Sequence, residues 1–125
     1  MCRLLIVSSL ILLPGCISFT DKPDTGIKHI VLCWLAAPGN STYRDQVIRT
    51  SKELATIPGI IDMSVGTAVP SDRKIIDDSF DVGIVMTFNN IEEMNAYINH
   101  EEHMKRVREV LGPSCQRILV YDFAY

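Results

Sequence analysis

The stretch that decides the fold is residues 81–103, DVGIVMTFNNIEEMNAYINHEEH. Residues 80–88 alternate large apolar side chains with smaller or polar ones, which predicts a strand. Two asparagines follow, and asparagine is a favoured N-cap residue of a helix. Ile91, Met94 and Ile98 then recur at helical spacing. The stretch therefore predicts a buried strand that runs directly into an amphipathic helix.

The second half of that helix is out of register with the first. Its apolar stripe resumes at Met104, Val107 and Leu111, so a break or kink is expected around residues 99–102. A Gly-Pro pair at residues 112–113 predicts the end of the helix, because glycine terminates helices and proline cannot continue them.

The remaining segments complete the pattern around this stretch. β-branched and aromatic residues predict strands at 27–35, more weakly at 60–69, and at 116–123. Residues 40–56 predict a helix whose first asparagine, serine and threonine offer N-cap oxygens. The order β-α-β-β-α-β predicts the ferredoxin-like α+β fold, a four-stranded antiparallel sheet with both helices on one face.

The predicted strands are apolar on both faces. In residues 27–35, Ile27, Val31 and Leu35 lie on one face, and three other large apolar side chains lie on the opposite one. Two helices cover only one face of such a sheet, and a large apolar face is rarely left exposed on a soluble monomer. The simplest cover is the same face of a second copy. A two-fold homodimer whose stacked sheets form an α/β barrel is therefore expected.

Composition sets limits on function. The chain has 125 residues, of which 47% are hydrophobic and 22% charged, and a formal net charge of −3. These values fit one small domain. No basic patch or stripe is available to neutralise phosphates, so nucleic-acid binding is not expected. No stretch approaches the roughly 20 apolar residues that a membrane-spanning helix needs.

Residues 1–16 resemble a bacterial lipoprotein signal. Arg3 is the only charge, an apolar run occupies 4–13, and Leu-Pro-Gly-Cys ends at Cys16. In a lipobox the cysteine is acylated and becomes the mature N-terminus, which predicts that a lipid anchor holds the protein on a membrane. The alternatives are an ordinary signal peptide with a chance cysteine, or a buried N-terminal strand.

On the lipoprotein interpretation, the protein resides in the bacterial cell envelope. Ile17, in place of an aspartate after the lipidated cysteine, fits delivery to the outer membrane if the cell is Gram-negative. Residues 17–26 then form a polar tether, and the folded domain spans 27–123.

Cys33 and Cys115 are the cysteines of the folded domain. In the ferredoxin-like order their strands are antiparallel neighbours, so the two residues can come close. An oxidising envelope permits a disulfide, although bridges between adjacent strands are geometrically demanding. The sequence is compatible both with a disulfide between these cysteines and with two free thiols.

Several short motifs together resemble the stress-responsive A/B barrel family, also called dimeric α+β barrel proteins. In order, they are IKHIVL at 27–32, IPG at 57–59, SVG at 64–66, FDVG at 80–83, TF at 87–88, YINHEEH at 97–103 and VYDF at 120–123. The resemblance implies a homodimeric barrel with a pocket between the helices and the sheet of each subunit. Most members of the family have no assigned reaction.

The resemblance also indicates site residues. One plant member of the family closes a polyketide ring without a cofactor, using histidine and tyrosine side chains. Aligned by motif, His103 and Tyr97 match two of its functional positions, and His29 matches a histidine of its first strand. Val82 stands where that enzyme has a histidine, and Thr50 stands where it has a tyrosine.

The family usually has His-Pro-x-His where this chain has His-Glu-Glu-His. His100 and His103 are three residues apart and can share a helix face, so a general base or a metal pair is conceivable. Neither His-Glu-x-x-His nor His-x-x-Glu-His is present, and two histidines alone do not complete a metal site. No metal and no other cofactor is expected.

His103 is the preferred acid–base candidate, because an unperturbed histidine has a pKa of about 6.5. Tyr97 is its expected partner at the pocket mouth. Two alternatives are pocket lining without chemistry and a purely structural role, in which His103 and Tyr97 hydrogen-bond one another or the backbone and fix the helix break. His29 is expected to be a satisfied core residue, paired with Asp122 on the last strand.

Three functions fit these observations. The first is a lipid-anchored dimeric module that binds a small, mostly apolar molecule. The second is an enzyme without a cofactor (a cyclase, isomerase, lyase or oxygenase) that uses His103 as acid or base. The third is a structural partner that docks another envelope protein. The small number of polar pocket candidates favours the first.

Overall fold

The computed structural model describes residues 25–125. The expected signal at 1–16, the anchor at Cys16 and most of the tether lie outside the described residues. In chain order the elements are β1 (Ile27–Leu35), α1 (Ser41–Glu53), η1 (Leu54–Thr56), β2 (Asp62–Gly66), β3 (Val82–Phe88), α2 (Ile91–Ile98), α3 (Glu101–Arg106), η2 (Val107–Leu111), α4 (Gly112–Ser114) and β4 (Cys115–Ala124).

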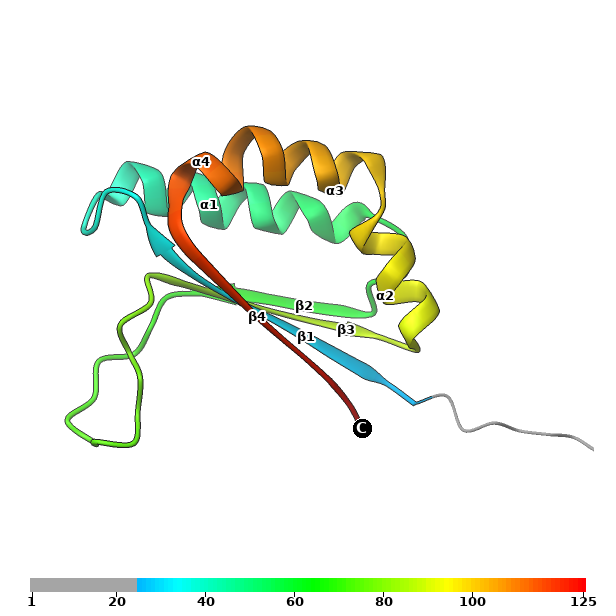
Figure 1. Cartoon of the computed structure of the whole chain (residues 1–125), viewed down its shortest axis with the longest axis horizontal. Helices are drawn as coiled ribbons and strands as arrows, with labels where there is room; N and C mark the ends of the chain where they lie inside the picture. Colours follow the sequence, from blue (N-terminus) through cyan, green and yellow to red (C-terminus); the bar gives the residue numbers. More distant parts are fainter. Residues whose placement is uncertain (1–24) are drawn as a thin grey trace, which may run out of the picture.

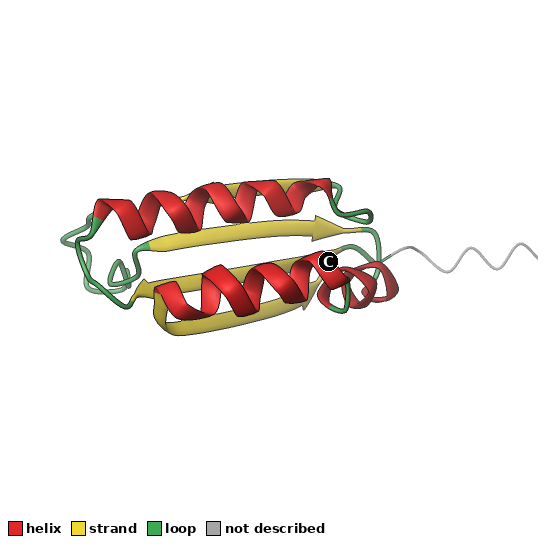
Figure 2. Cartoon of the chain, turned by 90° about the horizontal axis from the view of Figure 1, so that it is seen from above, coloured by secondary structure: helices red, strands yellow, loops and turns green. Residues whose placement is uncertain are grey.

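The four strands form one antiparallel sheet in the order β2-β3-β1-β4. The helices of residues 25–125 lie on the same side of it (Figure 1) and run over the strands when the molecule is seen from above (Figure 2). This arrangement confirms the predicted ferredoxin-like α+β fold. α2 packs against β1 and β3, and α1 packs against β2 and β3.

The strand bounds differ from the sequence-based ones at β2 and β3. β2 covers Asp62–Gly66 rather than 60–69, and β3 begins at Val82 rather than at residue 80. The ladder between them ends at the pair Gly66 and Gly83. Beyond that pair the chain enters the long loop between β2 and β3. Residues there that favour a strand have no partner strand to pair with, so neither strand extends further.

Local capping explains both helix starts. Asn40 accepts a hydrogen bond from the backbone N–H of Tyr43 at 3.1 Å, and Asn90 accepts one from that of Glu93 at 2.9 Å. Each asparagine satisfies a backbone donor that has no partner within its helix. These contacts confirm that asparagines cap both helices.

The predicted break in the second helix is confirmed. α2 ends at Ile98 and α3 begins after His100, whose side chain accepts from the backbone N–H of Glu102. The predicted end at residues 112–113 is wrong, because the helix continues to Ser114. The preceding turn is π-helical, with the N–H of Gly112 bonded to the carbonyl of Val107. This wider turn relieves the clash that a proline ring makes with the carbonyl four residues earlier.

The hydrophobic core fills the space between the sheet and the helices. Its largest fully buried side chains include Phe88 of β3 and Tyr97 of α2, whose ring centroids lie 5.3 Å apart. α1 contributes only a narrow buried stripe. Most of the core therefore comes from β1, β3 and the segment from α2 to η2, as the stretch 81–103 indicates.

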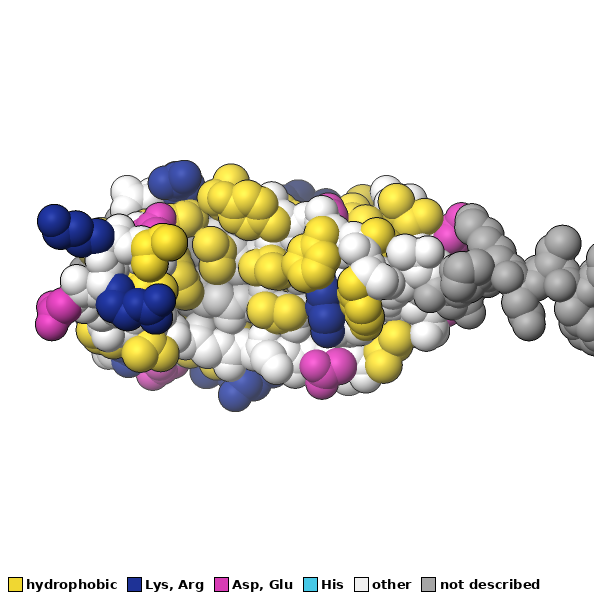
Figure 3. All heavy atoms as spheres, turned by 90° about the horizontal axis from the view of Figure 1, so that it is seen from below, with side chains coloured by type: hydrophobic (Ala, Val, Ile, Leu, Met, Phe, Trp, Pro, Cys, Tyr) yellow, Lys and Arg dark blue, Asp and Glu magenta, His cyan; other side chains and the backbone are white. Residues whose placement is uncertain are grey.

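The opposite face of the sheet carries apolar side chains without any helix above it. Alternate strand positions supply Lys28, Ile30, Leu32 and Trp34 of β1, Val85 and Thr87 of β3, and Arg117, Leu119, Tyr121 and Phe123 of β4. Tyr121 and Phe123 are 54% and 50% exposed. Figure 3 shows hydrophobic side chains gathered over this face with a few basic ones among them. The expectation of a second apolar face is confirmed, and we call it the open sheet face.

Within residues 25–125, no helix combines the length and the apolar character needed to cross a membrane.

Candidate functional site

A cavity of about 320 Å³ lies between the helix-covered face of the sheet and the helices. Strands of the sheet form its floor, and α1, α2, α3 and η2 form its roof. Its lining is mostly apolar and consists of His29, Val31, Cys33, Ser51, Leu54, Met63, Ile84, Met86, Tyr97, Ile98, His103, Val107, Leu111, Ile118, Val120 and Asp122. Ile118 and Val120 belong to the edge strand β4 and are 41% and 44% exposed, so the cavity opens along that edge.

Three predicted site residues meet in this cavity. His29 comes from β1, Tyr97 from the last turn of α2, and His103 from the first turn of α3. The ring of Tyr97 lies 6.4 Å from that of His29 and 4.6 Å from that of His103, between ring centroids. The fold therefore brings together side chains that are up to 74 residues apart in the chain.

The helix break positions His103. Its Nδ1 lies 2.8 Å from the carbonyl oxygen of Ile98, the last residue of α2. A carbonyl oxygen only accepts hydrogen bonds, so Nδ1 carries the proton and the neutral ring keeps an unprotonated Nε2. The backbone contact considered from the sequence is thus present, and it holds the tautomer that can accept a proton or a hydrogen bond.

Burial lowers the pKa of His103 below its ordinary value, because the charged ring would be desolvated. The hydrogen bond to Ile98 acts in the opposite direction, and the nearby rings of His29 and His100 lower the pKa further. His103 is therefore a neutral base at neutral pH.

Tyr97 is almost completely buried, with 1% of its surface exposed. Burial raises the pKa of its phenol, because the phenolate would lose its hydration. The side chain therefore remains protonated at neutral pH and acts as a hydrogen-bond donor rather than as a base.

His29 pairs with Asp122, as the sequence predicts. The two residues lie opposite one another on β1 and β4, and Nδ1 of His29 is 2.5 Å from Oδ1 of Asp122. The imidazole donates from Nδ1 because a carboxylate accepts. The His29 ring also contacts the edges of Phe88 and Tyr97, so it is held on three sides.

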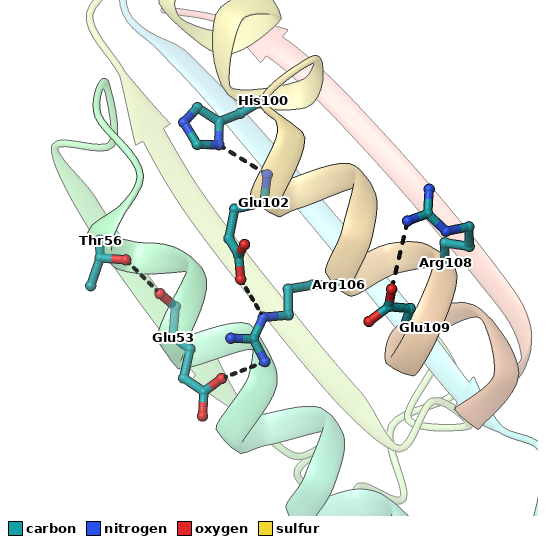
Figure 4. A network of polar contacts seen from close by, with 7 residues as sticks. All are labelled: Glu53, Thr56, His100, Glu102, Arg106, Arg108 and Glu109. Carbon is teal, nitrogen blue, oxygen red and sulfur yellow. Dashed lines mark hydrogen bonds and ion pairs between the residues drawn. The ribbon is translucent and has the colours of Figure 1, made fainter.

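The other residues expected at the pocket lie elsewhere. Val82 and Thr50 are buried in the core, and neither is among the side chains that line the cavity. His100 is exposed and caps α3, where its Nδ1 accepts from the backbone N–H of Glu102 at 3.2 Å (Figure 4). This nitrogen is already engaged in the N-cap of α3. Of the two histidines, only His103 lines the cavity.

Ser51 was not singled out from the sequence. It lies on α1, lines the cavity, and has no exposed surface. Its Oγ is the one buried side-chain polar atom within residues 25–125 that lacks a hydrogen-bond partner. The sequence could have indicated Ser51, because it is a polar residue on the narrow apolar stripe of α1. A polar side chain buried there needs a hydrogen-bond partner.

Ion pairs fasten the roof of the cavity to α1. Arg106 lies 2.8 Å from Glu102, one turn earlier on its own helix, and 3.0 Å from Glu53 at the end of α1 (Figure 4). These groups are roughly one-third to one-half exposed, so each pair contributes no more than about 1 kcal/mol. The network holds the two helices together outside the cavity.

Among the described residues, no group of three or more histidine, cysteine, aspartate or glutamate side chains is placed to hold a metal ion.

Family comparison decides the relationship suggested by the motifs. Residues 27–125 match the family model described as the Stress responsive A/B Barrel Domain. The chain belongs to this family. Among curated proteins, no relative matches the chain.

Several solved structures share the fold of this chain. A ferredoxin-like protein of the family from Mesorhizobium loti is 22% identical, with a TM-score of 0.67 over 79% of this chain and 95% of that one. A dimeric ferredoxin-like protein of unknown function from Thermobifida fusca is 22% identical, with a TM-score of 0.65 over 81% and 92%. A hydroxynitrile lyase from Passiflora edulis is 19% identical, with a TM-score of 0.71 over 82% and 95%.

Proposed function

We propose that this A/B barrel protein binds a small, mostly apolar molecule in the cavity between its sheet and helices. The observation that carries the proposal is the cavity itself, which has about 320 Å³ of space, apolar walls and an opening along β4. Natural ligand sites combine such walls with a few polar groups that fix orientation.

The polar groups of the cavity favour a ligand with one hydrogen-bonding function. Nε2 of His103 accepts, the hydroxyl of Tyr97 donates, and Ser51 offers a hydroxyl without a protein partner. A buried hydroxyl left unpaired costs about 1–3 kcal/mol, so a ligand group that reaches it gains affinity. An apolar molecule with a single hydroxyl group meets these requirements.

A matched pair of probes tests this proposal. Naphthalene and 2-naphthol differ only in a hydroxyl group, and both are fluorescent. We expect the protein to bind both, and 2-naphthol more tightly. Val120→Trp, which fills the opening, abolishes binding of both, whereas Val69→Trp on an exposed loop leaves it unchanged. Equal affinity of the two variants for 2-naphthol would contradict the proposal.

The open sheet face supports a homodimer of this chain. No helix within residues 25–125 covers it, Tyr121 and Phe123 remain half exposed, and the relative from Thermobifida fusca is dimeric. A two-fold stack of two such faces buries Tyr121 and Phe123 against a second copy. Light scattering should give twice the monomer mass for the wild type. Tyr121→Glu should give a folded monomer, and a folded, dimeric Tyr121→Glu variant would refute this arrangement.

We also propose that Cys16 carries a lipid that holds the domain at the bacterial envelope. The support is the apolar run at 4–13 followed by Leu-Pro-Gly-Cys. Mass spectrometry of the protein from membranes should find an acylated N-terminus at Cys16. Cys16→Ser should shift the protein to the aqueous fraction, and a membrane-bound, unmodified Cys16→Ser protein would rule this anchor out.

Acid–base catalysis by His103 is the second candidate function. The observation that favours it is the tautomer, because the Ile98 carbonyl holds the proton on Nδ1 and leaves Nε2 basic. The hydroxynitrile lyase from Passiflora edulis shows that the fold also occurs in an enzyme. In a substrate screen, His103→Gln should remove any turnover while 2-naphthol still binds. Turnover that survives His103→Gln would exclude this role.

A further inference from the structure

Two cysteines lie near one another where the end of β1 meets the start of β4. Cys33 is near the end of β1 and lines the cavity, with 1% of its surface exposed. Cys115 is the first residue of β4, half-buried and packed against the same core. Both are free cysteines. They come from opposite ends of the domain, and the antiparallel pairing of β1 with β4 brings them together.

The strand register places both side chains on the helix-covered face. Cys33 pairs with Ile118, whereas Cys115 pairs with Leu35, two residues further along β1. The two cysteines are therefore diagonal neighbours, and such Cβ atoms lie about 7 Å apart. Both side chains pack against the same core, so the two thiols lie within reach of one another across this gap.

We propose that Cys33 and Cys115 form a thiol–disulfide exchange site whose co-substrate is a disulfide. Cys115 is the attacking thiol, because it is the more exposed of the two, and Cys33 is the resolving thiol, because it is buried behind Cys115. This proposal does not depend on the ligand of the cavity or on the lipid anchor.

The exchange proceeds in two balanced steps. The Cys115 thiolate attacks one sulfur of an external disulfide, forms a mixed disulfide, and releases one thiolate. Cys33 then loses its proton and attacks the sulfur of Cys115, which expels the second thiolate. Two protein thiols lose two electrons and two protons in total, and the external disulfide is reduced to two thiols.

The electrostatics agree with this order. The neighbouring Cys33 thiol is the main cause that lowers the pKa of Cys115 below its ordinary value. The neighbouring Cys115 thiol, burial and the negative charge on Cys115 all raise the pKa of Cys33. The thiolate therefore forms on the more accessible sulfur, which is the property of an attacking cysteine.

Closing the bridge requires a local movement. Bridged cysteines have Cβ atoms about 3.8 Å apart, closer than diagonal strand neighbours. The ladder is already irregular between Trp34 and Leu35, and Cys115 sits where the chain passes from α4 into β4. The start of β4 can therefore move toward β1. A bridge under such strain is easily reduced, as in labile rather than structural disulfides.

Peptide mapping of the full chain tests the site directly. The reduced protein is incubated with oxidised glutathione, its remaining thiols are blocked with N-ethylmaleimide, and it is digested with trypsin. Cleavage after lysine and arginine places Cys33 in peptide 29–44 and Cys115 in peptide 109–117, apart from Cys2 and Cys16. We expect these two peptides to become linked and to separate again in an excess of reduced glutathione.

Two variants test the order of attack. Cys33→Ser should accumulate glutathione on peptide 109–117, because the resolving thiol is missing. Cys115→Ser should leave peptide 29–44 free of glutathione, because Cys33 is buried. Cys33→Ala replaces Cys33→Ser if circular dichroism shows that the buried hydroxyl prevents folding. The peptide mapping of the wild-type protein does not depend on which Cys33 variant is used.

Three results would overturn the proposal. Peptides that carry only N-ethylmaleimide after treatment with oxidised glutathione would show that the thiols do not exchange. A bridge that resists an excess of reduced glutathione would be a structural disulfide. Glutathione on Cys33 of Cys115→Ser, with none on Cys115 of the Cys33 variant, would reverse the roles.

Discussion

Asp122 of β4 accepts a 2.5 Å hydrogen bond from His29, which lies directly opposite it on β1. His29 is 6% exposed, whereas Asp122 stands at the opening of the cavity on the edge strand. The pair fixes the His29 ring against Tyr97, and Tyr97 in turn packs on His103. The polar end of the cavity is thus an ordered row of side chains that begins at an exposed carboxylate.

Removing that carboxylate should destabilise the protein modestly. Asp122→Ala leaves Nδ1 of a buried histidine without its acceptor. Because the carboxylate is 41% exposed, solvent screening limits the loss to about 1 kcal/mol. Urea denaturation should show this decrease in the free energy of unfolding. Asp72→Ala, in an exposed loop, serves as the matched control. The same loss in both variants would show that the pair contributes nothing specific.

The stability of the protein should depend on pH through His103. Its pKa is lowered by folding, so the unfolded chain binds the proton first as the pH falls. Stability is therefore complete above the unfolded pKa of about 6.5 and decreases as the pH drops from there through the folded pKa. The nearby rings of His29 and His100 also disfavour the charge on His103.

Denaturation of the wild type and of His103→Gln at pH 8 and pH 5 measures this effect. The wild type should lose more stability between the two pH values than His103→Gln does, because the variant lacks the titrating ring. His100→Gln, at the exposed cap of α3, should retain most of the wild-type dependence on pH, because burial is the main cause that lowers the pKa of His103. A wild type and a His103→Gln variant with the same dependence would show that another group is responsible.

The cap of α2 should matter for the site because α2 carries Tyr97. Asn90→Ala removes the acceptor for the backbone N–H of Glu93, and loss of such a cap costs about 1 kcal/mol. Asn95→Ala, at an exposed position of the same helix, should change the free energy of unfolding by less than about 0.5 kcal/mol. Thermal unfolding of both variants compares them, and a more stable Asn90→Ala variant would contradict the capping geometry.

Periodicity predicted most of the fold because the fold depends on where apolar side chains recur. The apolar pattern predicted the strand and helix in 81–103, the break after Ile98 and the second apolar face. The extent of β2 was not, because pairing with β3 rather than propensity determines where it ends. The helical turn through Pro113 was missed for a related reason, since a π turn depends on the backbone and leaves no periodic signal.

The site was harder to predict than the fold. The pairing of His29 with Asp122 followed from neighbouring strands, but the position of Ser51 on the cavity wall depends on how α1 packs. The contact between the rings of Tyr97 and His103 depends on the angle between α2 and α3. Such angles are set by the packing of the whole core, so residues that share a motif, such as His100 and His103, can face different surroundings.

Two glycines of the β2 region should respond differently to an added methyl group. Gly59 ends the turn after η1 with a φ of 100°, a conformation that L-residues adopt only under strain, and its new Cβ would lie 3.5 Å from Glu93. Gly59→Ala should therefore lower the free energy of unfolding by about 1–2 kcal/mol.

Gly66, the last residue of β2, has no atom within 4 Å of such a Cβ and no positive φ. Gly66→Ala should be neutral or slightly stabilising, because alanine reduces the entropy of the unfolded chain. Urea midpoints compare the two variants at equal slope, and equal losses would mean that the turn at Gly59 does not require this backbone conformation.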